Sequence, residues 1–319
     1  MIKTEIIADS INQQGKRLTT FILEYPRFIH AEVMTHRVFS KNAASSRAIP
    51  FEKFVQQITE NPAMPEFWGK NQSGMQANVE LSNDEIYQFS PYLDGGVDKW
   101  SGMGKKDAAK AVWIDARDSA IKWAEKLNEL GCHKQIVNRI LEPWFHIRVI
   151  LSGTEFENFF ALRAHNDAQP EFRVLAEKML KNYNSSTPKN LTEGEWHIPF
   201  GDKIDEKRLK NQIAFDSIKG HDSVRNKLLN EAKMKIAVAR CARVSYHNFE
   251  GKDDYQADIK LCDRLFGSIP RHLSPTEHVA MNMNDTNYYG NFCGFKQYRK
   301  FFQDENLKDS RVDKLQPRA

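Results

Sequence analysis

The stretch TFILEYPRFIHAEVMTHRVFSKNAASSR, residues 20–47, runs from a strand through a helix into a loop. The Thr-, Phe-, Ile- and Leu-rich part up to Tyr25 predicts a strand, and Pro26 fits the first turn of a helix. The apolar residues that follow at helical spacing are Phe28, Ile29, Val33 and Met34. Residues 40–49 carry Ser, Asn and Ala without an apolar stripe, which predicts a loop.

The end of this helix and its loop, residues 35–47, form the densest polar cluster of the chain. Two arginines, a histidine and several serines fall within thirteen residues. Arginine suits bidentate phosphate binding, and serine hydroxyls with loop N–H groups can complete an anion site. Composition alone favours the alternative, a solvated helix terminus followed by a polar loop.

The remaining periodicity mixes strands and helices along the whole chain. Residues 2–25 predict a β-hairpin with a turn at 12–16, and residues 144–151 and 278–283 predict further strands. Helices are expected at 51–59, 106–130, 133–141, 155–163, 169–183, 225–241, 255–266 and 292–302. The strand and helix at 278–302 resemble those at 20–36, which suggests a weak internal repeat.

Composition describes an ordinary globular protein. The chain has 319 residues, 40% hydrophobic and 28% charged, with a net charge of +4. Mean hydropathy is −0.62 and no run of 18 apolar residues occurs, so we expect neither a membrane span nor disorder. Charged residues interrupt the first thirty positions, so we expect no signal peptide and a cytoplasmic location. The four scattered cysteines predict reduced thiols.

Three sequence blocks resemble the flavin-dependent thymidylate synthases (ThyX). His36-Arg37, seven residues and then Ser45 and Arg47 are similar to the family's R-H-R-x7-S-x-R signature, with Thr35 in place of the first Arg. NRILEP (138–143), ENFFALR (157–163) and AQPE (168–171) are similar to its R-x-x-x-P, N-F-x-x-L-R and A-Q-x-E stretches. ARVSY (242–246) and HLSPTEH (272–278) resemble A-R-V-S-[FY] and H-x-[ST]-P-F-E-H.

The resemblance implies an α+β fold with a central, mostly antiparallel sheet flanked by helices. The blocks cover about half of one catalytic domain spanning residues 1–319, with insertions at about 51–130 and 184–235. The third block follows the R-H-R block here, whereas in the family it comes first. Circular permutation or partial duplication would explain this order, and permutation is tolerated where the old termini were close together.

The resemblance also implies the site. FAD would be held by His36, Arg37, Asn158, His272, Ser274 and Glu277. The nucleotide would be held by Glu32, Ser45, Ser46, Arg47, Arg139, Arg163 and Asp167, among which Ser45, Arg47 and Arg163 are the residues expected to take part in catalysis. The implied reaction transfers one carbon from 5,10-methylenetetrahydrofolate to C5 of dUMP, giving dTMP, and NADPH reduces the flavin. FAD at subunit interfaces implies a homo-oligomer, a tetramer or a dimer.

Two departures from the family leave dCMP open as the substrate, with hydroxymethylation as the reaction. Glu32 stands where the family has Gln, and Asp167 stands where it commonly has His. A carboxylate only accepts hydrogen bonds, and cytosine offers the N4 amino donor that uracil lacks. Ala43 replaces a family Glu as well. Drift away from the base edge is the alternative explanation.

Other classes of function fit less well. A nucleic-acid-binding protein is disfavoured by the small net charge and the absence of a basic stripe, while a catalytically silent relative is made plausible by Thr35 and Ala43. We expect no metal site, no stable nucleic-acid complex and no membrane contact. Cys132 fits a structural cysteine at a helix start. The island 196–200 predicts a satisfied histidine in a small apolar cluster.

Overall fold

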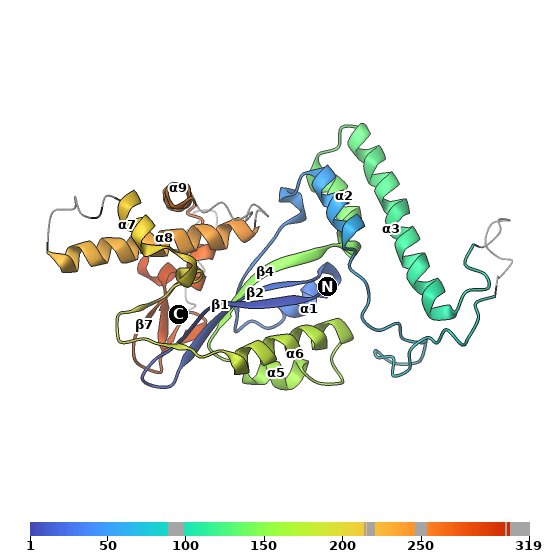
Figure 1. Cartoon of the computed structure of the whole chain (residues 1–319), viewed down its shortest axis with the longest axis horizontal. Helices are drawn as coiled ribbons and strands as arrows, with labels where there is room; N and C mark the ends of the chain where they lie inside the picture. The colour runs from blue at the N-terminus through green and yellow to red at the C-terminus, as the bar shows by residue number, and fades with distance from the viewer. Residues whose placement is uncertain (89–98, 214, 216–220, 246–253, 304, 307–319) are drawn as a thin grey trace, which may run out of the picture.

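The computed structural model describes residues 1–88, 99–213, 215, 221–245, 254–303 and 305–306 (Figure 1). Its main sheet has the order β3-β4-β2-β1-β5. The strands are β1 (Lys3–Ile11), β2 (Arg17–Pro26), β3 (Ser40–Ala43), β4 (His146–Gly153) and β5 (Lys189–Asn190). All neighbours are antiparallel except β1 and β5. The predicted N-terminal hairpin and the mostly antiparallel α+β architecture are therefore confirmed.

One face of this sheet packs on α5 (Glu157–Arg163) and α6 (Pro170–Ser185), which lie below it in Figure 1. Alternate residues of β2, Phe21 and Leu23, are fully buried in the main hydrophobic core on this side. The Phe21 ring meets Phe156 edge to face at a centroid distance of 5.6 Å. Such alternation of buried residues is what fixes the register of a strand.

The opposite face is only partly covered. The C-terminal part of α8 (Asp222–Ser245) places Cys241 and Val244 in a small cluster with Ile7, Ile150 and Phe200. At the other end of the sheet, α2 (Phe51–Glu60) packs on the start of β4, where the Phe54 and Phe145 rings lie 4.8 Å apart. Figure 1 shows α2 and α8 on the same side of the sheet.

Short elements connect these layers. The chain passes from β2 through η1 (Arg27–Ile29) and α1 (His30–Met34) to β3, then through η2 (Ser46–Ala48) to α2. The long helix α3 (Lys105–Glu129) leads through α4 (Lys134–Val137) and η3 (Asn138–Trp144) into β4. Helices α7 (Glu206–Gln212) and α9 (Tyr255–Gly267) pack with α8 around the buried Leu209, Ile236 and Tyr255. The helices expected at 51–59, 106–130, 155–163, 169–183, 225–241 and 255–266 are confirmed.

A second sheet of order β10-β7-β6 is formed by β6 (Trp196–His197), β7 (Ala280–Asn282) and β10 (Phe295–Gln297), and η6 (Ser274–His278) precedes β7. A buried hydrogen-bond chain joins it to the main sheet. His278 Nδ1 lies 2.8 Å from Ser152 Oγ, which lies 2.7 Å from Thr20 Oγ1. Thr20 continues to His197 Nε2 at 2.8 Å, and His197 Nδ1 reaches Ser10 Oγ at 2.9 Å. His197 is thus the satisfied histidine that the sequence predicted.

The loop prediction for residues 40–49 is wrong in its first half. Ser40–Ala43 forms the edge strand β3, paired with β4, and Ser40 and Asn42 are buried. Polar residues can form this buried strand because their side chains have hydrogen-bond partners. For example, Ser40 Oγ accepts from Gln297 Nε2 at 2.8 Å. An apolar stripe is therefore unnecessary, and the sequence pattern has no signal for the strand.

The helix expected at 292–302 is also wrong. The segment forms β9 (Phe292–Cys293), which pairs with β8 (Tyr288–Tyr289), then β10 and η7 (Tyr298–Phe301). Gly290 and Gly294 adopt φ of 79° and 75°, values that favour glycine and suit tight turns. The suggested strand-and-helix repeat of 20–36 is not present here.

Two helix boundaries differ as well. The helix expected at 133–141 is α4 followed by the 3-10 helix η3, which contains Pro143. Pro26 is the last residue of β2, opposite His146, and also the N-cap of η1, so the helix that follows it begins as a 3-10 helix before α1. Within the described ranges no helix is long and apolar enough to cross a membrane.

Candidate active site

Arg163 and His36 meet at the ends of α5 and α1. The Nε of Arg163 donates to Nε2 of His36 at 2.8 Å. Burial and the Arg163 charge lower the pKa of His36 to about 4, so the imidazole is neutral and able to accept. The guanidinium also lies 4.9 Å over the Phe172 ring. Its terminal NH2 groups have no hydrogen-bond partner among the described residues and are free to form a fork to an oxyanion.

Glu32 lies within electrostatic reach of Arg163. Burial raises the pKa of the Glu32 carboxyl, and the Arg163 charge partly opposes this shift. The neighbouring Glu171 is almost fully buried and accepts from the backbone N–H of Glu66 at 2.8 Å. The charge of Glu32 therefore interacts with that of Arg163 at the end of α5, without a direct ion pair between them among the described residues.

A second cluster gathers around Glu142, in η3. Its Oε1 accepts from Ser46 Oγ at 2.6 Å and from Arg139 Nη1 at 2.9 Å. Its Oε2 lies 3.9 Å from Arg27 Nη2. The amide of Asn138 adds hydrogen bonds to the carbonyls of Ser46 and Ile49. Ser46 and Arg139, which are 93 positions apart in the chain, are therefore neighbours, as the resemblance implied.

Ser45 and Arg47 lie at the edge of this cluster. Arg47 Nε donates to Ser45 Oγ at 3.4 Å, and the Arg47 side chain is otherwise exposed. Its terminal NH2 groups have no partner within the described residues. With Arg139, which is also exposed, it presents two guanidinium groups and a hydroxyl to solvent, a donor set that fits a phosphate monoester.

His30 and Lys41 lie between the two clusters. His30 Nδ1 is 2.9 Å from the Tyr25 hydroxyl, and its pKa is lowered to about 4 by burial and by the charges of Arg27 and Lys41. Lys41 Nζ donates to the carbonyl of Val33 at 3.3 Å and also contacts that of His36. Burial lowers the pKa of Lys41 to about 8. This ammonium caps the C-terminal end of α1 directly beneath the His36 turn.

The third sequence block lies close to the first. Gln297 Nε2 bridges Ser40 Oγ at 2.8 Å and the backbone oxygen of Glu277 at 3.1 Å. The Glu277 carboxylate is held by Arg299 Nη1 at 2.6 Å. These bonds fasten η6 to the start of β3, which follows Arg37 by three positions in the chain.

Several candidate flavin-binding side chains are exposed. Arg37, Asn158, His272 and Ser274 all face solvent, and none has a side-chain hydrogen bond to another described residue. A guanidinium, an amide, an imidazole and a hydroxyl provide donors of the kind that the phosphates and ring edge of FAD require. The residues present fit the group in their chemistry.

Asp167 is the candidate nucleotide-binding residue that the structure does not join to the others. Its side chain is 82% exposed, and Oδ2 lies 3.6 Å from His165 Nδ1. Its backbone oxygen contacts the Gln76 amide, which belongs to the segment expected as an insertion. No contact joins its carboxylate to Arg163 among the described residues. Glu32 is therefore the better placed of the two carboxylates.

Sequence reasoning missed Glu142, Lys41 and Gln297 as residues that organise the site. Glu142 and Lys41 occupy unspecified positions within the motifs, and Gln297 lies outside them. Glu142 has a weak signal, because it stands three residues after Arg139, the spacing of an ion pair on one helical turn. Lys41 and Gln297 have none, because their partners are backbone carbonyls and a distant serine.

The described part of the chain contains no group of three or more His, Cys, Asp or Glu able to hold a metal ion. The four cysteines are unpaired, as expected. Cys132 precedes α4, whose N-terminus is capped by His133 Nδ1 accepting from Gln135 N at 3.3 Å. Cys132 itself packs against the main core, in line with a structural role.

The sequence of the chain matches a known family. The sequence profile of the family "Thymidylate synthase complementing protein" matches residues 17–189, more than half of the chain. The chain belongs to this family. The match includes the first two sequence blocks, whereas the third lies beyond it.

Individual relatives are distant. The flavin-dependent thymidylate synthase of Aquifex aeolicus (strain VF5) is 25% identical over 177 residues, 54% of this chain and 48% of the relative. The chain thus spans about half the length of the curated relative that it matches. Two solved structures of a UMP/dUMP methylase, PolB, from Streptomyces cacaoi, bound with 5-Br dUMP or 5-Br UMP, are 15% and 16% identical. Each covers 57% of this chain, the alignments cover 90% and 88% of PolB, and both TM-scores are 0.39.

Proposed function

We propose that this protein is a flavin-dependent enzyme that transfers a one-carbon unit to C5 of a pyrimidine deoxynucleotide monophosphate, converting dUMP to dTMP. The observation that carries the proposal is the pairing of neutral His36 with Arg163, because it joins the first two sequence blocks and leaves the arginine fork free for an anion. Family membership and the name of the Aquifex relative support a flavin-dependent reaction of this kind.

The nucleotide would bind through Arg163 and the Glu142 cluster. Arg47 and Arg139 would supply positive charge to its phosphate, while the Ser45 and Ser46 hydroxyls are near enough to add neutral contacts. Arg163 is proposed to hold the base or its carbonyl edge, with Glu32 beside it. Two guanidinium groups and one hydroxyl match the donors that a phosphate dianion takes.

FAD would lie against the exposed donors around His36, Arg37 and Asn158, with His272, Ser274 and Glu277 contributed by the segment fastened to β3. When bound and reduced by NADPH, the flavin supplies the hydride that completes transfer from 5,10-methylenetetrahydrofolate. The residues of this chain bind and orient: Arg163 fixes His36 in its neutral form, and Lys41 holds the turn that carries it. We also propose that flavin binding involves a homo-oligomer, a dimer or a tetramer.

Hydroxymethylation of dCMP is the second candidate, and the placement of Glu32 favours it. A half-buried carboxylate near Arg163 can accept from the N4 amino group of cytosine, which uracil lacks. With uracil bound, the Glu32 carboxylate would have no hydrogen-bond donor at the base edge. This unpaired acceptor would weaken the binding of dUMP relative to dCMP.

The decisive test is a product assay by mass spectrometry. The full chain is incubated with FAD, NADPH and methylenetetrahydrofolate, and dUMP and dCMP are offered separately. Methylated dUMP supports the thymidylate reaction, and hydroxymethylated dCMP supports the second candidate. A preparation that takes up no flavin, judged by absorption near about 450 nm, and gives neither product would contradict both.

A further inference from the structure

One segment outside the three sequence blocks contacts the elements that carry both clusters of the candidate nucleotide site. This bridging segment, residues 61–88, follows α2 and belongs to the stretch expected as an insertion. It meets the end of η3, the element with Arg139 and Glu142, and it also meets the turn that follows α5, the helix that ends at Arg163. It is therefore placed to fix one cluster relative to the other.

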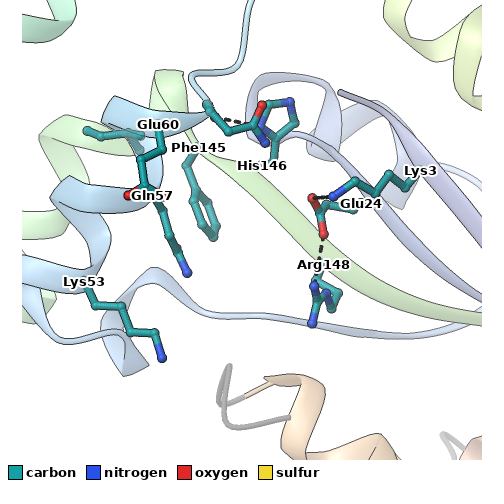
Figure 2. A pocket seen from close by; sticks show the side chains of 10 residues that line it. Lys3, Glu24, Lys53, Gln57, Glu60, Phe145, His146 and Arg148 are labelled. Carbon is teal, nitrogen blue, oxygen red and sulfur yellow. Dashed lines mark hydrogen bonds and ion pairs between the residues drawn. The ribbon is translucent and has the colours of Figure 1, made fainter. Parts of the chain in front are cut away.

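The start of the bridging segment is hydrogen-bonded to the end of η3. Ala63 N donates to the carbonyl of Trp144 at 2.8 Å, and the Ala63 carbonyl accepts from Trp113 Nε1 of α3 at 2.9 Å. His146 Nδ1 lies 3.2 Å from the carbonyl of Asn61, and Figure 2 shows the His146 side chain close to the end of α2. Ala63 is fully buried, so this end is packed firmly against its neighbours.

The body of the bridging segment forms a short antiparallel pairing. Lys70 N donates to the carbonyl of Val79, and Leu81 N donates to the carbonyl of Trp68, both at 2.8 Å. The Trp68 ring meets Trp113 of α3 edge to face, at a centroid distance of 6.3 Å. Backbone pairing and an aromatic contact with a long helix give the segment a defined shape, so it can hold the elements at its two sides apart by a fixed distance.

A second set of bonds ties the bridging segment to the chain between α5 and α6. The carboxylate of Glu171, a residue only 4% exposed, accepts from Glu66 N at 2.8 Å and from Gln169 Nε2 at 3.2 Å. Gln76 Nε2 donates to the carbonyl of Asp167. The segment is thus attached at the α5–α6 turn and at the first turn of α6.

These attachment points lie next to the arginine proposed to hold the base. The Arg163 guanidinium lies 4.9 Å over the ring of Phe172, which follows Glu171 directly in the chain. Burial raises the pKa of the Glu32 carboxyl, the Arg163 charge lowers it, and the Glu171 charge adds a further increase. Movement of Glu171 would therefore change both the ring beneath the guanidinium and the charge near it.

A nucleotide monophosphate would have to reach both clusters, with its phosphate at Arg47 and Arg139 and its base at Arg163. Two contacts made by one ligand support each other only when their separation matches the ligand, and a mismatch loses the joint affinity. The elements that carry these contacts, η3 and α5, are both joined to the bridging segment.

We propose, on the basis of the function proposed above, that the bridging segment sets the separation between the phosphate-binding and base-binding halves of the nucleotide site. Glu171 and Gln76 are its positioning residues. Neither contacts the nucleotide: Glu171 acts by holding the backbone of Glu66, and Gln76 acts by holding the backbone of Asp167. The ligand whose binding depends on them is a pyrimidine nucleotide monophosphate bound by both halves at once.

The test is equilibrium dialysis of dUMP against the full chain supplied with FAD. The variants are Gln76→Ala, Glu171→Leu and Glu171→Gln, each made alone and together with Arg163→Ala. Glu177→Leu is the matched control for α6, since this carboxylate is 56% exposed, and Gln56→Ala is the control for an exposed amide, on α2. Thermal melts establish that each variant is folded, and flavin absorbance reports its cofactor content.

We expect dUMP affinity to fall about three- to tenfold in Gln76→Ala and about tenfold in Glu171→Leu, with the two controls unchanged. Glu171→Gln should keep most of the affinity, because its amide oxygen can still accept from the N–H of Glu66. In the Arg163→Ala background the same substitutions should have no further effect, since the nucleotide is then bound by one half only and the separation no longer matters.

The inference is overturned if dUMP affinity is unchanged in Glu171→Leu, or in Gln76→Ala should Glu171→Leu not fold. It is also overturned if the losses add fully to that of Arg163→Ala, as a general weakening of the fold would make them do, or if Glu177→Leu loses as much affinity. An Arg163→Ala protein that binds dUMP normally would contradict the proposed function itself. Product formation by the unmodified chain is independent of these outcomes, so the two failures are distinguishable.

Discussion

Arg163 approaches His36 through Nε, not through the end of its guanidinium, and the 2.8 Å bond leaves the terminal fork of the arginine pointing away from the imidazole. The bond therefore fixes the plane of the guanidinium while keeping both NH2 groups for a ligand. Because neutral imidazole must accept this bond, the lowered pKa of His36 is part of the same arrangement.

Arg163→Ala is expected to weaken nucleotide binding about 10- to 100-fold while flavin binding remains, since a charge-assisted pair is lost. Arg163→Lys should fail to restore it, because an ammonium cannot give Nε to His36 and a fork to the ligand together. Equilibrium dialysis with dUMP and flavin absorbance measures both. Arg173→Ala, on α6 and paired with Asn166, is the control. Unchanged dUMP affinity in Arg163→Ala would show that its assignment is wrong.

Glu142→Gln should loosen the second cluster. The carboxylate holds Ser46, Arg139 and, more distantly, Arg27. Loss of its charge is expected to lower the free energy of unfolding by about 1–2 kcal/mol, because the group is only 18% exposed and carries two close hydrogen bonds. Urea denaturation measures this. Glu129→Gln, whose ion pair with Lys126 is fully surface-exposed, should change stability by less than about 0.5 kcal/mol. Equal effects in the two variants would contradict the cluster.

Gln297→Leu should detach η6 from β3. The buried amide makes hydrogen bonds to Ser40 and to the backbone of Glu277, and leucine can make neither. We expect a loss of about 1–3 kcal/mol in the free energy of unfolding and weaker flavin retention, because the proposed flavin-binding segment 272–278 loses its anchor. Asn291→Ala removes a longer, 3.3 Å bond to the same Ser40 and serves as the control. Flavin affinity that is equal in both variants would argue against flavin contact by this segment.

Acid should destabilise the protein through its buried histidines. Burial lowers the pKa of His197 and His278 to about 3 each, below the value of about 6.5 for an unfolded chain. The unfolded state therefore binds more protons between those values, and stability, complete above about pH 6.5, falls as the pH drops toward 3. Each histidine contributes a slope of up to about 1.4 kcal/mol per pH unit.

Urea midpoints measured from pH 7.5 to pH 5 test this pH dependence. His197→Gln and His278→Gln should each lower the slope by up to one proton, even where they lower stability overall. His133→Gln, at an exposed helix cap, is the control for replacing a histidine outside the buried chain. A slope that is the same in all four proteins would mean that the buried chain titrates normally.

The sequence predicts the elements whose pattern is local. The hairpin of β1 and β2 and the helices α2, α3, α5 and α6 follow from alternation or helical spacing, and the structure confirms them. It fails for β3 and for residues 292–302, where polar residues and short turns are stabilised by partners far away in the chain. Tertiary hydrogen bonds override propensity there.

The candidate site, too, is predicted from the sequence only in part. Ser46 near Arg139 and His36 beside Arg163 follow from the family resemblance, and the structure brings each pair together. The motifs do not identify Glu142 and Lys41, the groups that hold these pairs. Glu142 acts through an ion pair with Arg139, three positions before it, and Lys41 donates to backbone carbonyls, which no residue type marks in the sequence. Asp167, placed by its position relative to a motif, has a side chain that is 82% exposed and lies 3.6 Å from His165 Nδ1.

The bond between Gln297 and Ser40 spans 257 positions of the chain. A ribosome therefore releases the edge strand β3 long before the residue that satisfies its buried hydroxyl has been made. The segment with His36 and Arg37 therefore stays incompletely anchored until Gln297 has been made. Contacts of such long range slow folding, so the segments proposed to bind flavin should become ordered together only after residue 297 has left the ribosome.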